Sequence, residues 1–261
     1  MASTYQDIVL ITGANTGLGF ELAKQLLRDH GDRFYVLVGC RTLTKGEAAV
    51  KELHDQGLQE CEMLHIEVTE DDSIAEAAKI VQERFGRLDV LHVNAGIGYP
   101  DKDWLPAGAS LSACIMETMR TNVAGAAQTA EAFIPLLQKA DNPRLTFMST
   151  ALGSLAVAST FKGVGESFPA YSASKAALNM VMLYHWGRFG EVMRINACAP
   201  GFRATNLNGF GAAGGPTKPK PGPLDLGVRN AIRLTLLSKD GESGTFTDWK
   251  DDAAEPSVVP W

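Results

Sequence analysis

The sequence predicts a single α/β domain built on a doubly wound parallel sheet of about seven strands, with helices on both faces. Short apolar runs alternate with longer helical segments along most of the chain, and no internal repeat interrupts the alternation. The 261 residues suffice for one large domain. Because parallel strands are buried on both faces, we expect their sequences to be continuous apolar runs.

The expected elements follow one another in regular order. Strands are predicted at residues 8–12, 34–39, 62–66, 90–93, 144–148 and 194–199. Helices are predicted at residues 18–30, 45–56, 72–85, 114–137, 171–189 and 226–237. The connections between successive parallel strands are then right-handed crossovers through these helices.

One compositional break stands out, the Gly- and Pro-rich segment at residues 206–224. Only one predicted helix and a short tail follow it, which is too little chain for a second core. Residues 1–261 are therefore expected to form one domain. We interpret residues 206–224 as a mobile loop over the substrate.

The bulk composition excludes several function classes. The net charge is −6 and no run of Lys and Arg occurs, which argues against a nucleic-acid partner. No uncharged apolar stretch reaches the length of about 18 residues that spans a membrane. The four cysteines lack metal-ligand spacing, so no metal site is expected. The polar start of the chain resembles no secretory leader, and we expect a cytoplasmic protein with a small-molecule partner.

A glycine-rich turn directly follows the first predicted strand and opens the first predicted helix. It reads TGANTGLG, with glycines at positions 13, 17 and 19. Glycines allow a tight turn and a close approach of the backbone to a pyrophosphate. The free N–H groups and the positive dipole end of the helix favour the same phosphates. The turn therefore predicts a dinucleotide cofactor.

A tyrosine and a lysine supply the candidate proton chemistry. Tyr171 and Lys175 stand four residues apart, so on a helix their side chains share one face. An isolated tyrosine has a pKa of about 10, and a nearby cation is expected to lower that pKa. Tyr171 can then protonate a carbonyl oxygen as hydride reaches the carbon, or remove the proton in the reverse direction.

Several motifs, in this order and at these intervals, resemble the short-chain dehydrogenase/reductase family, in its carbonyl-reductase-like form. They are the G-x-x-x-G-x-G spacing of the glycine turn, Asn94-Ala95-Gly96, Asn122, Tyr171-x-x-x-Lys175 and Pro200-Gly201. The resemblance covers nearly the whole chain. It implies a Rossmann fold and oxidoreductase activity, with Lys175 also reaching the nicotinamide ribose.

The resemblance also implies a catalytic hydroxyl after the fifth strand and a supporting asparagine. The family register, two serines before x-x-Gly, places Ser149 at the first position and Thr150 at the catalytic one. Adjacent strand residues point to opposite faces, so only one can serve; Thr150 is favoured and Ser149 stays open. Asn122 is implied to hold a water that relays protons to Lys175.

The residue pattern after the second strand indicates which nicotinamide cofactor is used. An acid there would bind the ribose hydroxyls of NAD, but the chain has Gly39-Cys40-Arg41, and Arg41 suits a 2′-phosphate. NADP(H) is therefore predicted. The complete set of predicted cofactor-binding residues is Gly13, Asn15, Thr16, Gly17, Leu18, Gly19, Arg41, Glu67, Val68, Asn94, Ala95, Gly96, Tyr171, Lys175, Pro200, Gly201 and Thr205.

The substrate and the assembly state are predicted only in outline. Aromatic side chains near the expected mouth of the site favour an apolar or aromatic ketone or alcohol: Tyr99, Trp104, Phe161, Phe168, Phe202 and Phe210. The helix at 171–189 is apolar on more than one face, which predicts a homodimer or homotetramer. Two alternatives stay open: an NADP(H)-binding sensor of the same fold, or a related reaction such as imine reduction or epimerisation.

Overall fold

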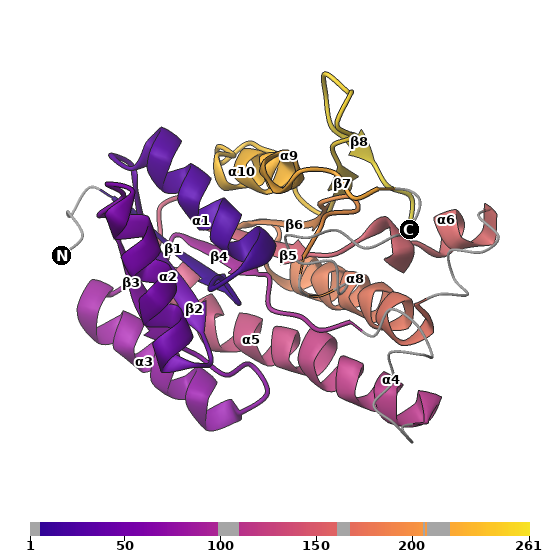
Figure 1. Ribbon diagram of the computed structural model, residues 1–261, viewed down its shortest axis with the longest axis horizontal. Coiled ribbons are helices and arrows are strands. Elements are labelled where there is room, and N and C mark those ends of the chain that lie inside the picture. Colours follow the sequence, from indigo (N-terminus) through magenta and orange to yellow (C-terminus); the bar gives the residue numbers. More distant parts are fainter. Residues whose placement is uncertain (1–5, 99–109, 161–167, 206, 208–219) are drawn as a thin grey trace.

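The structure is a computed structural model that describes residues 6–98, 110–160, 168–205, 207 and 220–261. One eight-stranded sheet runs through this part of the chain in the order β3-β2-β1-β4-β5-β6-β7-β8, with helices on both faces (Figure 1). The strands are β1 (Asp7–Thr12), β2 (Phe34–Cys40), β3 (Cys61–His65), β4 (Val90–Val93), β5 (Arg144–Met148), β6 (Arg194–Ala199), β7 (Phe246–Asp248) and β8 (Ser257–Val258). All neighbours pair in parallel except β7 and β8, which are antiparallel. The predicted fold class is confirmed.

The helices fall into two layers. They are α1 (Gly17–His30), α2 (Leu43–Asp55), α3 (Asp71–Phe85), α4 (Leu111–Met119), α5 (Ala126–Leu137), α6 (Leu155–Thr160), α8 (Pro169–Phe189), α9 (Leu224–Gly227) and α10 (Arg229–Thr235). One core cluster joins the sheet to α3, α5 and α8. The other joins the opposite face to α1, α2 and α10. Alternate residues of β1 enter the two clusters, Leu10 the first and Val9 the second, as strand geometry requires.

The structure differs from the predicted elements in three places. The predicted helix at 114–137 contains one π-helical stretch, η2 (Arg120–Gly125), between α4 and α5. The predicted helix at 226–237 consists of α9 and α10. The short tail after it, to which no element was assigned from the sequence, contributes β7 and β8. Most of the predicted substrate loop at 206–224 lies outside the described residues.

The strand order creates a crevice at the centre of the sheet. Strand β1 pairs with β2 on one side and with β4 on the other, because the chain proceeds outward to β3 and then returns across β1. The connections that leave β1 and β4 therefore diverge at the carboxyl ends of these strands. In open α/β sheets such a reversal point is where ligands bind.

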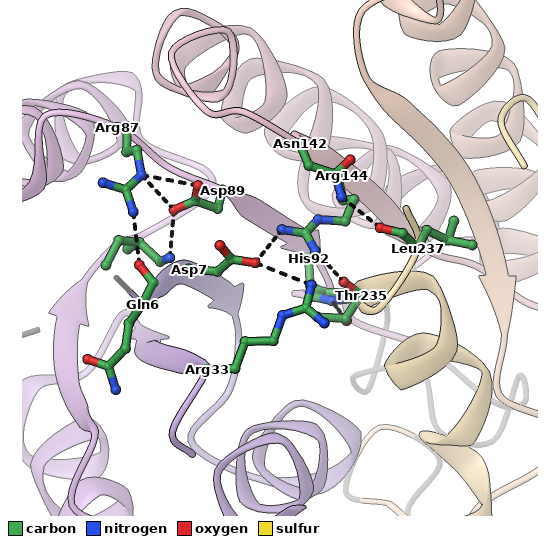
Figure 2. A network of polar contacts seen from close by, with 11 residues as sticks. Gln6, Asp7, Arg33, Arg87, Asp89, His92, Asn142, Arg144, Thr235 and Leu237 are labelled. Atoms are coloured by element: carbon green, nitrogen blue, oxygen red, sulfur yellow. Dashed lines mark hydrogen bonds and ion pairs between the residues drawn. The ribbon is translucent and has the colours of Figure 1, made fainter. Parts of the chain in front are cut away.

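A buried polar network joins strands at the opposite, amino-terminal end of the sheet (Figure 2). Arg144, whose side chain is only 1% exposed, begins β5 and donates to Asp7 Oδ2 at 2.8 Å and to the carbonyl oxygen of Thr235 at 2.8 Å. His92 Nε2 lies 2.7 Å from the hydroxyl of Thr235. Burial and the nearby Arg144 cation lower the pKa of His92 to about 3, so this imidazole is neutral at physiological pH.

Helix α8 carries apolar side chains on its outer face as well as its inner one. Leu178 and Met182 are buried against the sheet. Met180, Tyr184 and Trp186 are 66%, 55% and 42% exposed. Within the described part of the chain, neither α8 nor any other helix is long and apolar enough to cross a membrane.

The buried network leads to a stability prediction. Arg144→Ala removes the buried cation and leaves a cavity, so we expect the free energy of unfolding to fall by about 3 kcal/mol. Arg33→Ala is the matched control, because Arg33 approaches the same carboxylate at 3.5 Å but is 43% exposed. The control should lose less than about 1 kcal/mol. If denaturant unfolding shows the same loss of unfolding free energy for Arg144→Ala and Arg33→Ala, burial is not the reason that Arg144 stabilises the fold.

Candidate active site

A cavity of about 550 Å³ opens at the carboxyl ends of the central strands, a volume typical of ligand pockets. The residues that line it include most of those predicted to bind the cofactor: Gly13, Asn15, Thr16, Gly17, Leu18, Gly19, Arg41, Glu67, Val68, Asn94, Ala95, Gly96, Tyr171, Lys175, Pro200 and Thr205. Ser149 also lines the cavity, whereas Gly201, Asn122 and Thr150 do not. The structure thus brings together at one crevice residues that are spread over nearly 200 positions of sequence.

The glycine turn is tightly folded and packs closely on the loop after β4. Gly13 and Gly17 have φ angles of +66° and +61°, in the left-handed region that favours glycine. A Cβ at Gly19 would lie 2.5 Å from Asn94 Nδ2 and 2.8 Å from the carbonyl oxygen of Gly13. Helix α1 begins at Gly17, so its unpaired N–H groups face the cavity. This cradle fits the pyrophosphate of a dinucleotide.

A single hydroxyl joins the glycine turn to the loop after β4. Thr12 Oγ1 accepts from the backbone N–H groups of Asn94 and Ala95, each at 3.0 Å. The side-chain Nδ2 of Asn94 in turn donates to the carbonyl oxygen of Thr12 at 2.8 Å. These bonds hold the ends of β1 and β4 together beneath the cavity.

Two cationic side chains and one carboxylate line the cavity where β2 ends. Arg41 is exposed, and its Nη1 lies 3.7 Å from Glu67 Oε2. The other oxygen of Glu67 accepts from both the backbone and the hydroxyl of Thr69, at 3.2 and 3.0 Å. Lys45, on the first turn of α2, is exposed and was not predicted from the sequence. The sequence signal that could have identified Lys45 is its spacing of four residues from Arg41. The local charge is net positive, which favours an anion.

The predicted acid/base pair lies at the far side of the same cavity. Lys175 is buried, and its Nζ donates to the carbonyl oxygen of Met148 at 2.6 Å. The same Nζ lies 5.7 Å from the centre of the Tyr171 ring. Tyr171 and Lys175 thus share one face of α8, as their spacing indicates.

The pKa of Tyr171 differs in direction from the sequence-based expectation. Burial raises the pKa of the Tyr171 phenol above its usual value. Burial also lowers the pKa of Lys175 to about 8, because a low-dielectric site penalises each charged form. Desolvation therefore outweighs the lowering of the Tyr171 pKa that was expected from the nearby lysine. Tyr171 is a neutral O–H donor throughout the physiological pH range.

Asn122 lies in the π-helical stretch η2 and is fully buried. Its Oδ1 accepts from the backbone N–H of Ile97 at 2.8 Å, and its Nδ2 donates to the carbonyl oxygen of Ile97 at 2.9 Å. The same Nδ2 donates to Ser174 Oγ at 3.0 Å. A Cβ at Gly96 would lie 3.1 Å from Asn122 Oδ1 and 3.7 Å from Lys175 Nζ. The asparagine therefore fixes the loop after β4 beside the lysine.

The two candidate hydroxyls after β5 have different surroundings. Ser149 is 2% exposed and donates to Asn179 Oδ1 at 2.6 Å. Thr150 is half-buried and opens the 3-10 turn η3 (Ala151–Gly153), where its hydroxyl accepts from the backbone N–H of Leu152 at 3.3 Å. The hydroxyl of Thr150 can therefore still donate a hydrogen bond to another acceptor. The hydroxyl of Ser149 already donates its proton to Asn179.

The segment after β6 is anchored by an arginine that the sequence analysis missed. Arg203 is 5% exposed, donates to the carbonyl oxygen of Pro200 at 2.7 Å and forms a bidentate ion pair with Asp251. Thr205 follows and contacts the glycine turn: a Cβ at Gly17 would lie 3.6 Å from its methyl group. The ion pair thus ties one wall of the cavity to the tail of the chain.

The aromatic side chains predicted near the mouth are only partly described. Phe168 and Phe202 are described and do not line the cavity. Tyr99, Trp104, Phe161 and Phe210 lie outside the described residues. The apolar lining that the structure does describe near Tyr171 comes from Ile97, Met148 and Leu207.

The fold, the crevice, the glycine turn and the helix N-terminus define a dinucleotide-binding α/β protein of the Rossmann class. Residues 7–212 match the family model of the short chain dehydrogenases, and the chain belongs to this family. It is therefore an oxidoreductase by family.

Relatives and solved structures agree with this assignment over nearly the whole chain. A short-chain dehydrogenase/reductase of Stachybotrys chlorohalonatus is 46% identical over 98% of this chain and 94% of its own length. A (+)-neomenthol dehydrogenase of Arabidopsis thaliana is 30% identical over 94% of this chain and 97% of its own. The NADPH-bound carbonyl reductase from chicken fatty liver matches with a TM-score of 0.80 and 27% identity, over 98% of this chain and 99% of its own.

The glycine cradle can be tested by adding one methyl group. Gly19→Ala would place a Cβ against Asn94 and the Gly13 backbone, so we expect the Kd of a nicotinamide dinucleotide to rise at least about tenfold. Gly187→Ala is the control, because Gly187 lies on an exposed stretch of α8 where a Cβ meets nothing within 4 Å. The control should leave that Kd unchanged. If Gly19→Ala binds the dinucleotide normally, the close packing of Gly19 on Asn94 is not needed for cofactor binding.

Proposed function

We propose that the protein is an NADPH-dependent ketoreductase that transfers hydride between the cofactor and a carbonyl or alcohol. The observation that carries this proposal is the position of the half-buried Tyr171 and the buried Lys175, which both line the cavity that the glycine turn also lines. An NADP(H) sensor needs the glycine turn but has no use for a proton donor at this position. The names of the neomenthol dehydrogenase and of the carbonyl reductase support the same reaction class.

The proposed mechanism assigns one task to each of three side chains. The nicotinamide cofactor, when bound, supplies the hydride. Tyr171 donates its phenolic proton to the carbonyl oxygen of the substrate, and its raised pKa keeps that proton in place until the oxygen becomes basic. Lys175 is cationic below pH 8 and stabilises the phenolate that forms. Thr150 donates a hydrogen bond that holds the carbonyl oxygen.

Thr150 is proposed over Ser149 on the basis of their hydrogen bonds. The proton of Ser149 is directed to Asn179 at 2.6 Å, inside the protein. Thr150 accepts one bond from Leu152 and can still donate one. The threonine methyl group does not change this donor chemistry. Asn122 is proposed to support Lys175 through the loop that it fixes at Ile97.

NADP(H) is proposed over NAD(H) because of the charges where β2 ends. Arg41 and Lys45 both line the cavity there, and the strand ends in Cys40 rather than an acid. Two cations suit a 2′-phosphate, with Arg41 able to bind it in a bidentate manner. Glu67 and Val68 are proposed to contact the adenine. Thr205, with the backbone of Pro200 and Gly201, is proposed to contact the nicotinamide end.

An apolar or aromatic ketone is the proposed substrate class. The described lining near Tyr171 is apolar: a Cβ at Gly98 would lie 2.9 Å from Leu207 and 3.4 Å from the Tyr171 ring. Apolar walls beside a single proton donor favour a hydrophobic carbonyl compound over a sugar phosphate. The neomenthol dehydrogenase among the relatives is named for an alcohol of this kind.

The proton donor is tested by Tyr171→Phe, which removes only the hydroxyl. We expect turnover of a ketone panel (acetophenone, tetralone and menthone, followed by NADPH absorbance) to fall at least about a thousandfold. The Kd for NADPH should stay within about twofold, because the ring remains. If the wild-type protein binds NADPH but reduces no panel member, the sensor function gains support. Full activity of Tyr171→Phe would refute the proposed acid.

Cofactor preference is tested at the two cations. Arg41→Ala and Lys45→Ala should each raise the Kd for NADPH about tenfold and leave the Kd for NADH nearly unchanged, since only NADPH carries the 2′-phosphate. Lys51→Ala is the control, because Lys51 lies on the same helix and pairs with Asp55 away from the cavity. Equal weakening of both cofactors would point to a role other than phosphate recognition.

A homo-oligomer, a dimer or tetramer, is proposed from the outer face of α8. Met180 and Tyr184 are 66% and 55% exposed and stand one helical turn apart, and adjacent exposed apolar side chains of this kind form a patch that a partner subunit can cover. Met180→Glu would place a charge on this face. We expect light scattering to show an oligomer for the wild type and a smaller species for Met180→Glu. A wild-type monomer at micromolar concentration would refute this proposal.

A further inference from the structure

We propose that Asn179 is a positioning residue that sets the direction of the Thr150 hydroxyl. The proposal rests on the proposed function, because Thr150 must be the hydroxyl that holds the substrate oxygen. Asn179 is 4% exposed and lies eight residues beyond Tyr171 and four beyond Lys175, so all three share one face of α8. This face meets the carboxyl end of β5.

Asn179 contacts both ends of the turn that contains Thr150. Its Oδ1 accepts from Ser149 Oγ at 2.6 Å, and its Nδ2 donates to the carbonyl oxygen of Gly153 at 3.4 Å. One side chain therefore connects the residue before Thr150 with the end of η3. The short bond from Ser149 is the stronger of the two and fixes the orientation of that residue.

The rest of α8 holds the same turn at two further points. Lys175 Nζ donates to the carbonyl oxygen of Met148, the last residue of β5, at 2.6 Å. Gly153 packs directly on the helix, since a Cβ there would lie 2.7 Å from the carbonyl carbon of Lys175. The residues on either side of Thr150 are thus bound to the helix that carries Tyr171.

The direction of Thr150 follows from these contacts. Thr150 follows Ser149 directly and has an extended backbone, with φ −160° and ψ 150°, and adjacent side chains of an extended chain project to opposite sides. Because Asn179 holds Ser149 on one side of the chain, the side chain of Thr150 is fixed on the other side. If Asn179 served packing alone, an apolar residue such as its neighbours Leu178 and Met182 would serve better, since a buried amide is costly unless bonded.

The test is a double-mutant cycle measured as kcat on the panel ketone that the wild type reduces fastest. Asn179→Ala should lower kcat about tenfold while the Kd for NADPH stays within about twofold. In a Thr150→Ala background, the same substitution should change kcat by less than about twofold, because no hydroxyl is left to position. Ser149→Ala, a smaller change that removes the same bond, should behave like Asn179→Ala and serves if that variant folds poorly.

Asn230→Ala is the matched control for lost stability. Asn230 is an equally buried asparagine on α10 whose Nδ2 donates to the Thr247 backbone and hydroxyl, both at 3.0 Å. It should lower Tm like Asn179→Ala but leave kcat unchanged.

Three outcomes would overturn the positioning role. They are equal losses of kcat from Asn179→Ala in both backgrounds, an unchanged kcat in Asn179→Ala, and an unchanged kcat in Thr150→Ala. Failure of the reductase function itself is recognised separately, by a wild-type protein that binds NADPH but reduces no ketone of the panel.

Discussion

The hydroxyl of Thr12 is the contact on which the rest of the site depends. It accepts the first two backbone N–H groups after β4, and thereby joins the ends of two strands whose connections diverge. The glycine turn begins at the next residue, so its position relative to the β4 loop is set by the same contact. Asn94 adds a further hydrogen bond between the two strand ends. It lies so close to Gly19 that a Cβ on Gly19 would overlap its side chain. The cradle is therefore a product of strand pairing as much as of the glycines.

Burial has a consequence for the acid/base pair that spacing alone does not reveal. A lysine beside a tyrosine was expected to lower the pKa of the phenol, whereas desolvation raises it and lowers that of Lys175 to about 8. The lysine cation is held instead by the carbonyl oxygen of Met148. In this arrangement the phenol keeps its proton, and the cation lies ready to compensate the charge that a proton transfer creates.

Much of the fold could be predicted from the sequence because its signals are local. The apolar runs of the first six strands and the spacing of Tyr171 and Lys175 need no knowledge of tertiary structure. Strands β7 and β8 could not be predicted, since three and two residues carry no periodicity and form strands only by pairing. The π-helical stretch around Asn122 was missed for a similar reason: its amide bonds to Ile97, which is 25 residues distant.

The candidate site shows the same division between local and long-range information. The glycine turn was found because its residues are adjacent. Lys45, Asn179 and the pair of Arg203 with Asp251 were missed, because each matters only through a partner that the fold supplies. Asp251 stands 48 residues after Arg203, at a distance where no spacing rule applies.

The arginine network at the other end of the sheet affects the order in which the chain can fold. Arg144 is 137 residues from Asp7 and 91 residues from Thr235, so its charge finds both partners only after most of the chain has been synthesised. Until then, burial of β5 would leave the guanidinium paired with Asp7 but without the carbonyl oxygen of Thr235, at an energetic cost. The half of the sheet that carries the glycine turn has no such requirement. A nascent chain can therefore assemble β1 to β4 early, while β5, and with it the turn that contains Thr150, obtains the last acceptor of Arg144 only when α10 has formed.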